Sequence, residues 1–174
     1  MNLLNKTDFD ALAPNEQRAA ICKDVIARLN AQKIVPNHGN FFINRDSVVS
    51  YSDLSLSVQE SINTKPCQAC AKGALFCSWV GNFNNVERDG LERVNEVTNS
   101  MANTVPELVT IFGREMLDNI EAAFEGDAYC WHYDEYATQM YAEAFSSYDL
   151  KGIMQYIVDN GGEFPLPADY NPYA

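Results

Sequence analysis

Two cysteines separated by two residues are the first residues in this chain that could do chemistry. Cys67 and Cys70 stand near the start of KPCQACAKGALFCSWVGNF, residues 65–83. A thiol in the first turn of a helix is made more acidic by the backbone N–H groups, and redox pairs use that arrangement. However, no βαβ pattern precedes the motif, and the residues after it are of a buried type. The sequence therefore favours small buried thiols in tight packing, with a thiol-redox site as an alternative.

Structural zinc is a second possibility for the same cysteines. Cys67 and Cys70 could be joined by Cys130 and His132, since thiolates and imidazoles are donors that zinc prefers. The C-x-H spacing of the second pair is unusual for zinc, and two thiols on one helix are poorly placed to meet distant ligands. We therefore predict no cofactor, and keep zinc at these four residues as the alternative.

The remaining candidates for catalysis are the histidines and one set of acids. His38 and His132 are the only histidines, and no motif pairs either of them with a cysteine. Asp118, Glu121 and Glu125 fall on one face of a predicted helix. We expect that face to point to solvent, because no Glu-x-x-His sequence accompanies it for a di-metal site. Phosphate-binding glycine loops and the nucleophile elbow are absent from the sequence. These observations favour a protein that is not an enzyme, although no motif decides the question.

Charge is distributed very unevenly along the chain. Residues 115–174 carry twelve Asp and Glu against Lys151 alone, a net charge of -11, whereas residues 1–114 carry eleven Lys and Arg against twelve acids. Eight of the nine tyrosines also lie in the last third, from Tyr129 onward. An acidic surface repels phosphate backbones, which argues against direct nucleic-acid binding there. The same surface would steer the protein towards a basic partner.

The aromatic and acidic residues around 129–141 form the predicted partner-binding surface. Tyrosine and tryptophan supply large contact areas at low entropic cost, as protein interfaces require. The residues we assign to this surface are Tyr129, Trp131, Tyr133, Asp134, Glu135, Tyr136 and Tyr141. The predicted function is a non-enzymatic protein that binds and inhibits a host protein with a basic surface, such as a defence nuclease or another nucleic-acid-handling factor.

Two other functions remain open on the sequence. A pocket for a small ligand, such as a signalling nucleotide, could stack a base on these aromatics. Its phosphates would need a cation from the first part of the chain, for which Arg18, Lys23 and Arg28 are the candidates. The third function is that of a structural-zinc or thiol-redox protein that uses Cys67 and Cys70.

A mainly α-helical fold is predicted to position these residues. Segment 65–83 has Lys72 as its only charge after Pro66, so we expect a buried central helix there. Helical spacing and capping residues predict further helices after Pro14, around 53–62, from Pro106 to Phe112, over 114–126, over 134–145, and after Ser147 or Asp149. Acidic helix faces, including that of 114–126, are expected to lie on the surface.

The rest of the chain is predicted to be less regular. Short β-prone runs at 41–43 and 48–51 predict at most a small hairpin. Residues 82–103 should form a short exposed helix or an ordered loop, and residues 166–174 an extended tail. A length of 174 residues and the lack of a dividing linker predict one domain, residues 1–174.

Cysteine content and the first residues bear on location. Five cysteines, an odd number, favour reduced thiols in a cytoplasm over a disulfide framework. The start, MNLLNKTDFDALAP, lacks the basic and apolar regions of a signal peptide. No apolar run is long enough to predict a membrane-spanning helix. We therefore expect a cytoplasmic protein that is not a membrane protein.

Four sequence blocks carry a resemblance to known proteins. They are KDVI at 23–26, CxxCAxGALF at 67–76, IEAAFE at 120–125, and IM with GGxF between 153 and 164. With these blocks the chain resembles a family of small proteins, encoded by bacteria and by phages or prophages, to which no activity is assigned. The resemblance implies phage origin and the host cytoplasm, and it carries over no catalytic residue. Segments 82–105 and 127–148 depart from the shorter members of that family, so a function specific to this chain is expected there.

Overall fold

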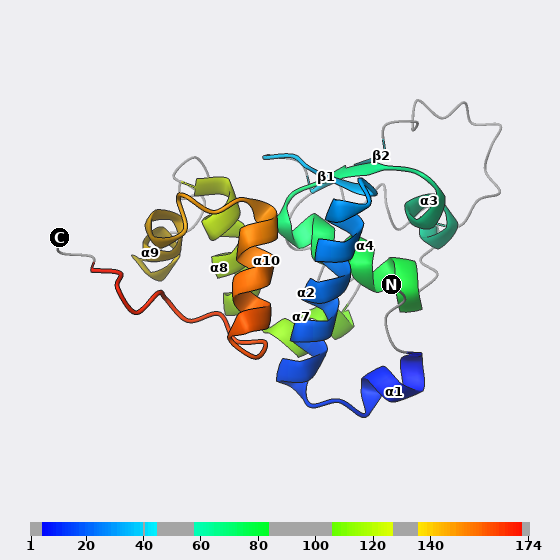
Figure 1. Cartoon of the computed structure of the whole chain (residues 1–174), viewed down its shortest axis with the longest axis horizontal. Helices are drawn as coiled ribbons and strands as arrows, with labels where there is room; N and C mark the ends of the chain where they lie inside the picture. Colours follow the sequence, from blue (N-terminus) through cyan, green and yellow to red (C-terminus); the bar gives the residue numbers. More distant parts are fainter. Residues whose placement is uncertain (1–4, 40, 45–57, 84–105, 127–135, 172–174) are drawn as a thin grey trace.

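The structure is a computed structural model that describes residues 5–39, 41–44, 58–83, 106–126 and 136–171 (Figure 1). These residues are mostly helical, which confirms the predicted mainly α class. The helices are α1 (Lys6–Asp10), α2 (Pro14–Asn30), α3 (Val58–Thr64), α4 (Ala71–Phe83), α7 (Pro106–Phe112), α8 (Arg114–Glu125), α9 (Tyr136–Ala144) and α10 (Leu150–Asp159). The strands are β1 (Ile34–Pro36), β2 (Phe42–Asn44) and β3 (Cys67–Ala69).

Helix α4 is the buried centre of the described residues. All its residues from Ala71 to Gly81 are buried, and α2, α3 and α8 pack around it. Cys77 and Trp79, two residues apart, lie on nearly opposite sides of the helix and are both buried, as expected for a helix surrounded by protein on all sides. The prediction of a buried central helix is therefore confirmed for its larger part.

The predicted start of that helix is wrong. Residues 67–69 form β3, which pairs in parallel with β1 and antiparallel with β2, giving the strand order β1-β3-β2. The helix begins only at Ala71. Pairing on both sides satisfies the backbone groups of β3, and this tertiary contact overrides the helical reading of a short segment.

The predicted hairpin is not tested, because its second half lies outside the described residues. Strand β2 bonds to β3, with Phe42 opposite Ala69 and Asn44 opposite Cys67, and β1 was not predicted at all. The other half of the expected hairpin, 48–51, and the segment 82–103 fall largely outside the described residues. A strand of three residues gives too little periodicity to be recognised from sequence alone.

Helices α2 and α10 lie side by side (Figure 1). Pro14 opens α2, where a missing N–H costs nothing. The Arg18 side chain donates from Nε to the Gly162 carbonyl at 2.6 Å and from Nη1 to the Ile111 carbonyl at 3.0 Å. One guanidinium thus joins α2 to the end of α7 and to the turn after α10.

The end of the chain folds back as its sequence predicts. Asp149 caps α10 by accepting the Gly152 N–H at 2.7 Å, and Gly161 and Gly162 have positive φ values in the turn that follows. Phe164 is buried against Phe145, with ring centroids 4.7 Å apart. Beyond it, residues 165–171 run past α9 without helix or strand (Figure 1). Within the described residues, no helix is both long and apolar enough to cross a membrane.

Gly73 of α4 lies in close contact with the backbone of Phe41, the residue just before β2. A Cβ at Gly73 would collide with the backbone carbonyl of Phe41. We expect Gly73→Ala to lower the free energy of unfolding by about 2–3 kcal/mol, even though alanine favours a helix over glycine by about 1 kcal/mol. Urea denaturation followed by circular dichroism measures the change.

The matched control is Gly152→Ala in α10. A Cβ there would meet only side-chain atoms, those of Asp149 and Tyr148 at 3.2 Å. The control should cost less than about 1 kcal/mol, because side chains can shift where a backbone cannot. Equal effects of the two substitutions would contradict the close packing of Gly73 on Phe41.

Candidate functional site

A cluster of three metal-ligating side chains lies where the beginning of α4 meets α8. The Cys70 Sγ and one carboxylate oxygen each from Glu121 and Glu125 all lie within 4.8 Å of one another. Cys70 is 1% exposed and Glu121 is 4% exposed. The prediction that Asp118, Glu121 and Glu125 face solvent is therefore wrong. That face of α8 packs against the first turn of α4, whose N–H groups are free of helical partners and can be capped by acids.

Glu121 caps α4 from a neighbouring helix. Its Oε2 accepts the Lys72 backbone N–H at 2.9 Å, and the Lys72 Nζ forms an ion pair with Asp118 at 2.5 Å. Both Lys72 and Glu121 are buried. Burial raises the pKa of Glu121, and the bonds from Cys70 and Lys72 offset only part of that rise. The carboxyl group therefore holds its proton more tightly in the folded state than in the unfolded state.

Cys70 is not the acidified thiol that its position suggests. Its Sγ accepts the Gly73 N–H at 3.4 Å, as an N-terminal helix cap does. Nevertheless, burial, followed by the negative charge of Glu121, raises the pKa of Cys70 well above its ordinary value. Without a bound cation, this thiol is protonated at neutral pH, which makes Cys70 a poor nucleophile for the redox alternative, whereas the hydrogen bond with Cys77 lowers the pKa of Cys67.

The two cysteines of the motif have different partners. Cys67 Sγ lies 3.5 Å from the Sγ of Cys77 and 3.3 Å from the Lys33 carbonyl oxygen. Cys70, one residue past the end of β3, meets the carboxylates of α8 instead. The predicted burial of these thiols is confirmed. Cys130 and His132, the other members of the predicted zinc set, lie outside the described residues.

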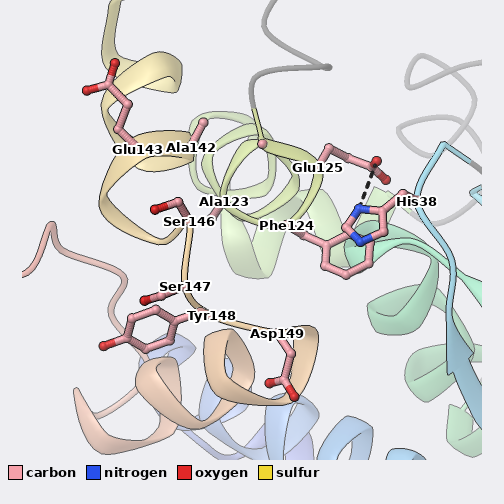
Figure 2. A pocket seen from close by; sticks show the side chains of 11 residues that line it. His38, Ala123, Phe124, Glu125, Ala142, Glu143, Ser146, Ser147, Tyr148 and Asp149 are labelled. Atoms are coloured by element: carbon pink, nitrogen blue, oxygen red, sulfur yellow. Dashed lines mark ion pairs between the residues drawn. The ribbon is translucent and has the colours of Figure 1, made fainter.

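His38 approaches the cluster from the loop after β1. Its Nδ1 lies 3.5 Å from Glu125 Oε2, and its ring stacks on Phe124 with centroids 4.2 Å apart (Figure 2). The Gly39 N–H donates to both Glu125 oxygens at 2.9 Å. The His38 side chain is 66% exposed, whereas that of Glu125 is 4% exposed. This histidine therefore lies between the buried cluster and the solvent.

A cleft of about 730 Å³ opens beside His38 (Figure 2). Its walls come from the end of α8, from α9 and from the turn before α10. Three lining residues are acids, namely Glu125, Glu143 and Asp149, and Tyr148 adds an aromatic ring that is 39% exposed. None of the lining residues is Lys or Arg. The cleft is thus suited to a cationic group.

The predicted partner-binding residues are only partly described. Tyr141 is half-buried in α9, and its hydroxyl donates to the Phe164 carbonyl at 2.7 Å. Tyr136 begins α9, where only its backbone is described. The remaining five fall outside the described residues: Tyr129, Trp131, Tyr133, Asp134 and Glu135. Sequence reasoning missed the cleft residues Glu143 and Asp149 as a site, because ordinary surface helices carry such acids too.

The cations considered for phosphate binding are engaged elsewhere. Arg18 bonds to two backbone carbonyls and to Glu163, and Arg28 pairs with Asp24 at 2.6 Å. Neither of them, nor Lys23, lines the cleft. A signalling nucleotide would therefore meet three carboxylates in this cleft, and its phosphates would be repelled.

The raised pKa of Glu121 predicts a pH-dependent effect of Glu121→Gln. Above pH 4.5, the ordinary pKa of the side chain, the unfolded state loses this proton before the folded state does. The contribution of Glu121 to the free energy of unfolding therefore falls as pH rises, up to the raised folded-state pKa. Relative to the unmodified protein, Glu121→Gln should gain stability over that interval and then level off.

Urea denaturation from pH 4.5 to neutral pH, with a chelator present, measures this difference. Glu115→Gln is the control, since Glu115 is an exposed acid of the same helix. The same pH trend in both variants would refute the assignment to buried Glu121.

Similar proteins of known function would provide independent evidence about this site. Comparison of the chain with protein-family models, with curated proteins and with solved structures gave no match. The site is therefore defined by its own geometry, a buried thiol–carboxylate cluster beside an acidic cleft.

Proposed function

We propose that this protein is a non-enzymatic binding protein that holds a basic segment of a partner protein in its acidic cleft. The observation that carries the proposal is the lining of that cleft, which includes three carboxylates and an exposed tyrosine ring but no Lys or Arg. A lysine or arginine side chain would find both opposite charge and an aromatic face there. Of the expected interface residues, those at 129–135 directly precede α9 in the sequence, and Tyr136 and Tyr141 belong to α9, one wall of the cleft.

The small free energy of each expected contact favours a partner that makes several contacts at once. An exposed ion pair contributes about 0.2–1 kcal/mol, and a cation on a tyrosine face about 0.5–1 kcal/mol at an exposed site. Glu143 and Asp149 are both exposed, so neither would bind a single lysine tightly. A segment with two or three basic residues would sum these contributions, and the net charge of -11 over residues 115–174 would speed its association.

The biological setting of the proposal is a phage protein in the host cytoplasm that inhibits a host factor. Its support is the resemblance of the CxxCAxGALF block at 67–76 to proteins encoded by phages and bacteria. Defence nucleases and other nucleic-acid-handling proteins present the basic surfaces that an acidic cleft would bind. Occupation of such a surface would compete with its nucleic acid, which is the proposed mode of inhibition.

A variant in which two of the three cleft carboxylates are neutralised tests the binding site. Glu143→Gln combined with Asp149→Asn removes two charges while keeping side-chain shape, and asparagine still caps α10. Against a lysine- and arginine-rich peptide, we expect affinity to fall about 2- to 30-fold, as the loss of two exposed ion pairs implies. Fluorescence anisotropy of a labelled peptide at two salt concentrations measures it.

The control is Glu115→Gln combined with Asp159→Asn, which changes the net charge equally. Both residues are exposed acids of the same third of the chain and lie outside the cleft. Equal losses in the two double variants would show that only net charge matters, and the cleft would be rejected as the site. A thermal-shift screen of nucleotides addresses the small-ligand alternative, for which the proposal expects no rise in melting temperature.

A further inference from the structure

We infer that Cys70, Glu121, Glu125 and His38 form a binding site for a zinc ion. The inference rests on a different observation from the proposed partner binding, although Glu125 and His38 also line the cleft. It also differs from the zinc set expected from the sequence, because it uses neither Cys67 nor the segment around Cys130. Among the described residues, the cluster of Cys70, Glu121 and Glu125 offers three donor atoms close enough to share one ion.

The three buried donors suit a tetrahedral ion after a small contraction, and His38, which approaches Glu125 alone, would move further to become the fourth ligand. Zinc bonds of about 2.0–2.3 Å in a tetrahedron place neighbouring ligand atoms about 3.3–3.8 Å apart. The three buried donors lie within 4.8 Å of one another, so movements of roughly 1 Å or slightly more would bring them to that spacing. His38 Nδ1 is already 3.5 Å from Glu125 Oε2.

The chemistry of the donors selects a metal of zinc's class. One thiol, two carboxylates and one imidazole supply four donors of the three types found in zinc sites, and the thiolate disfavours magnesium and calcium. Binding would release the thiol proton of Cys70 and any proton on Glu121 to solvent. The ion would then balance charges that are otherwise buried close together.

Supporting hydrogen bonds and an access route are also present. The Lys72 N–H bonds to Glu121 and the Gly39 N–H bonds to Glu125, and such contacts orient ligating carboxylates in metal sites. The stacking of His38 on Phe124 fixes its ring beside the cleft. Because His38 is the exposed member, an ion could enter from the cleft and be closed in by its imidazole.

Cobalt substitution tests the site directly. The full chain is stripped with a chelator and titrated with Co²⁺, whose bond to a thiolate gives a charge-transfer absorption band. We expect one ion per chain, loss of the band in Cys70→Ala, and retention of the band in Cys77→Ala and Cys22→Ala. Loss in Cys77→Ala with retention in Cys70→Ala would overturn the inference, as would binding of less than half an ion per chain.

Affinity for zinc provides a second readout that does not depend on a buried substitution. His38 is exposed, so His38→Ala should fold normally by circular dichroism. Competition with a chromophoric chelator should show at least about a tenfold weaker zinc affinity for His38→Ala and for Glu125→Gln. Unchanged affinity in both variants would refute the ligand set even if Cys70→Ala failed to fold.

Discussion

The structure depends on the way in which α8 caps the first turn of α4. A buried helix end leaves N–H groups that must find partners, or each costs about 1–3 kcal/mol. Here Glu121 accepts the N–H of Lys72, and the Cys70 thiol accepts that of Gly73. Because the Lys72 N–H lies at a fixed position on α4, its bond to Glu121 fixes how α8 sits against that helix. The position of α8 in turn places α9, which packs on its other side and forms a wall of the cleft.

Helices with clear caps and a one-sided apolar stripe could be predicted from sequence. Pro14 marked the start of α2, and Asp149 with Gly161-Gly162 marked both ends of α10. The boundary at residues 65–70 could not be predicted, because β3 is defined by partners on β1 and β2 that are distant in sequence. The periodicity of a sequence describes which residues share a face of one helix or strand. It contains no information about backbone hydrogen bonds to a strand elsewhere in the chain.

The candidate site shows the same limitation in its side chains. Glu121 and Glu125 lie four residues apart on α8, as solvent-exposed acids often do, and the amphipathic pattern assigned them to solvent. Glu121 is buried against the Lys72 N–H of α4, and Glu125 against the Gly39 N–H of the loop after β1, with the Cys70 thiol close to both. One signal of their burial was available in the sequence. In the segment IEAAFE at 120–125, both acids lie next to apolar residues that are themselves expected to be buried. By contrast, the acidic character of the cleft follows from composition, since nearly any surface in the last third would carry carboxylates.

The contact between α2 and α10 has a consequence for how the chain is made. Arg18 bonds to Gly162 across 144 residues, and the helices that this bond joins belong to opposite ends of the chain. A ribosome adding about 5–20 residues per second needs roughly 6–24 s to synthesise the roughly 120 residues between the two helices. During that time, the side of α2 that packs on α10 has no partner to cover it. Newly made chains would therefore expose that side of α2 to chaperones or to aggregation until α10 emerges from the ribosome.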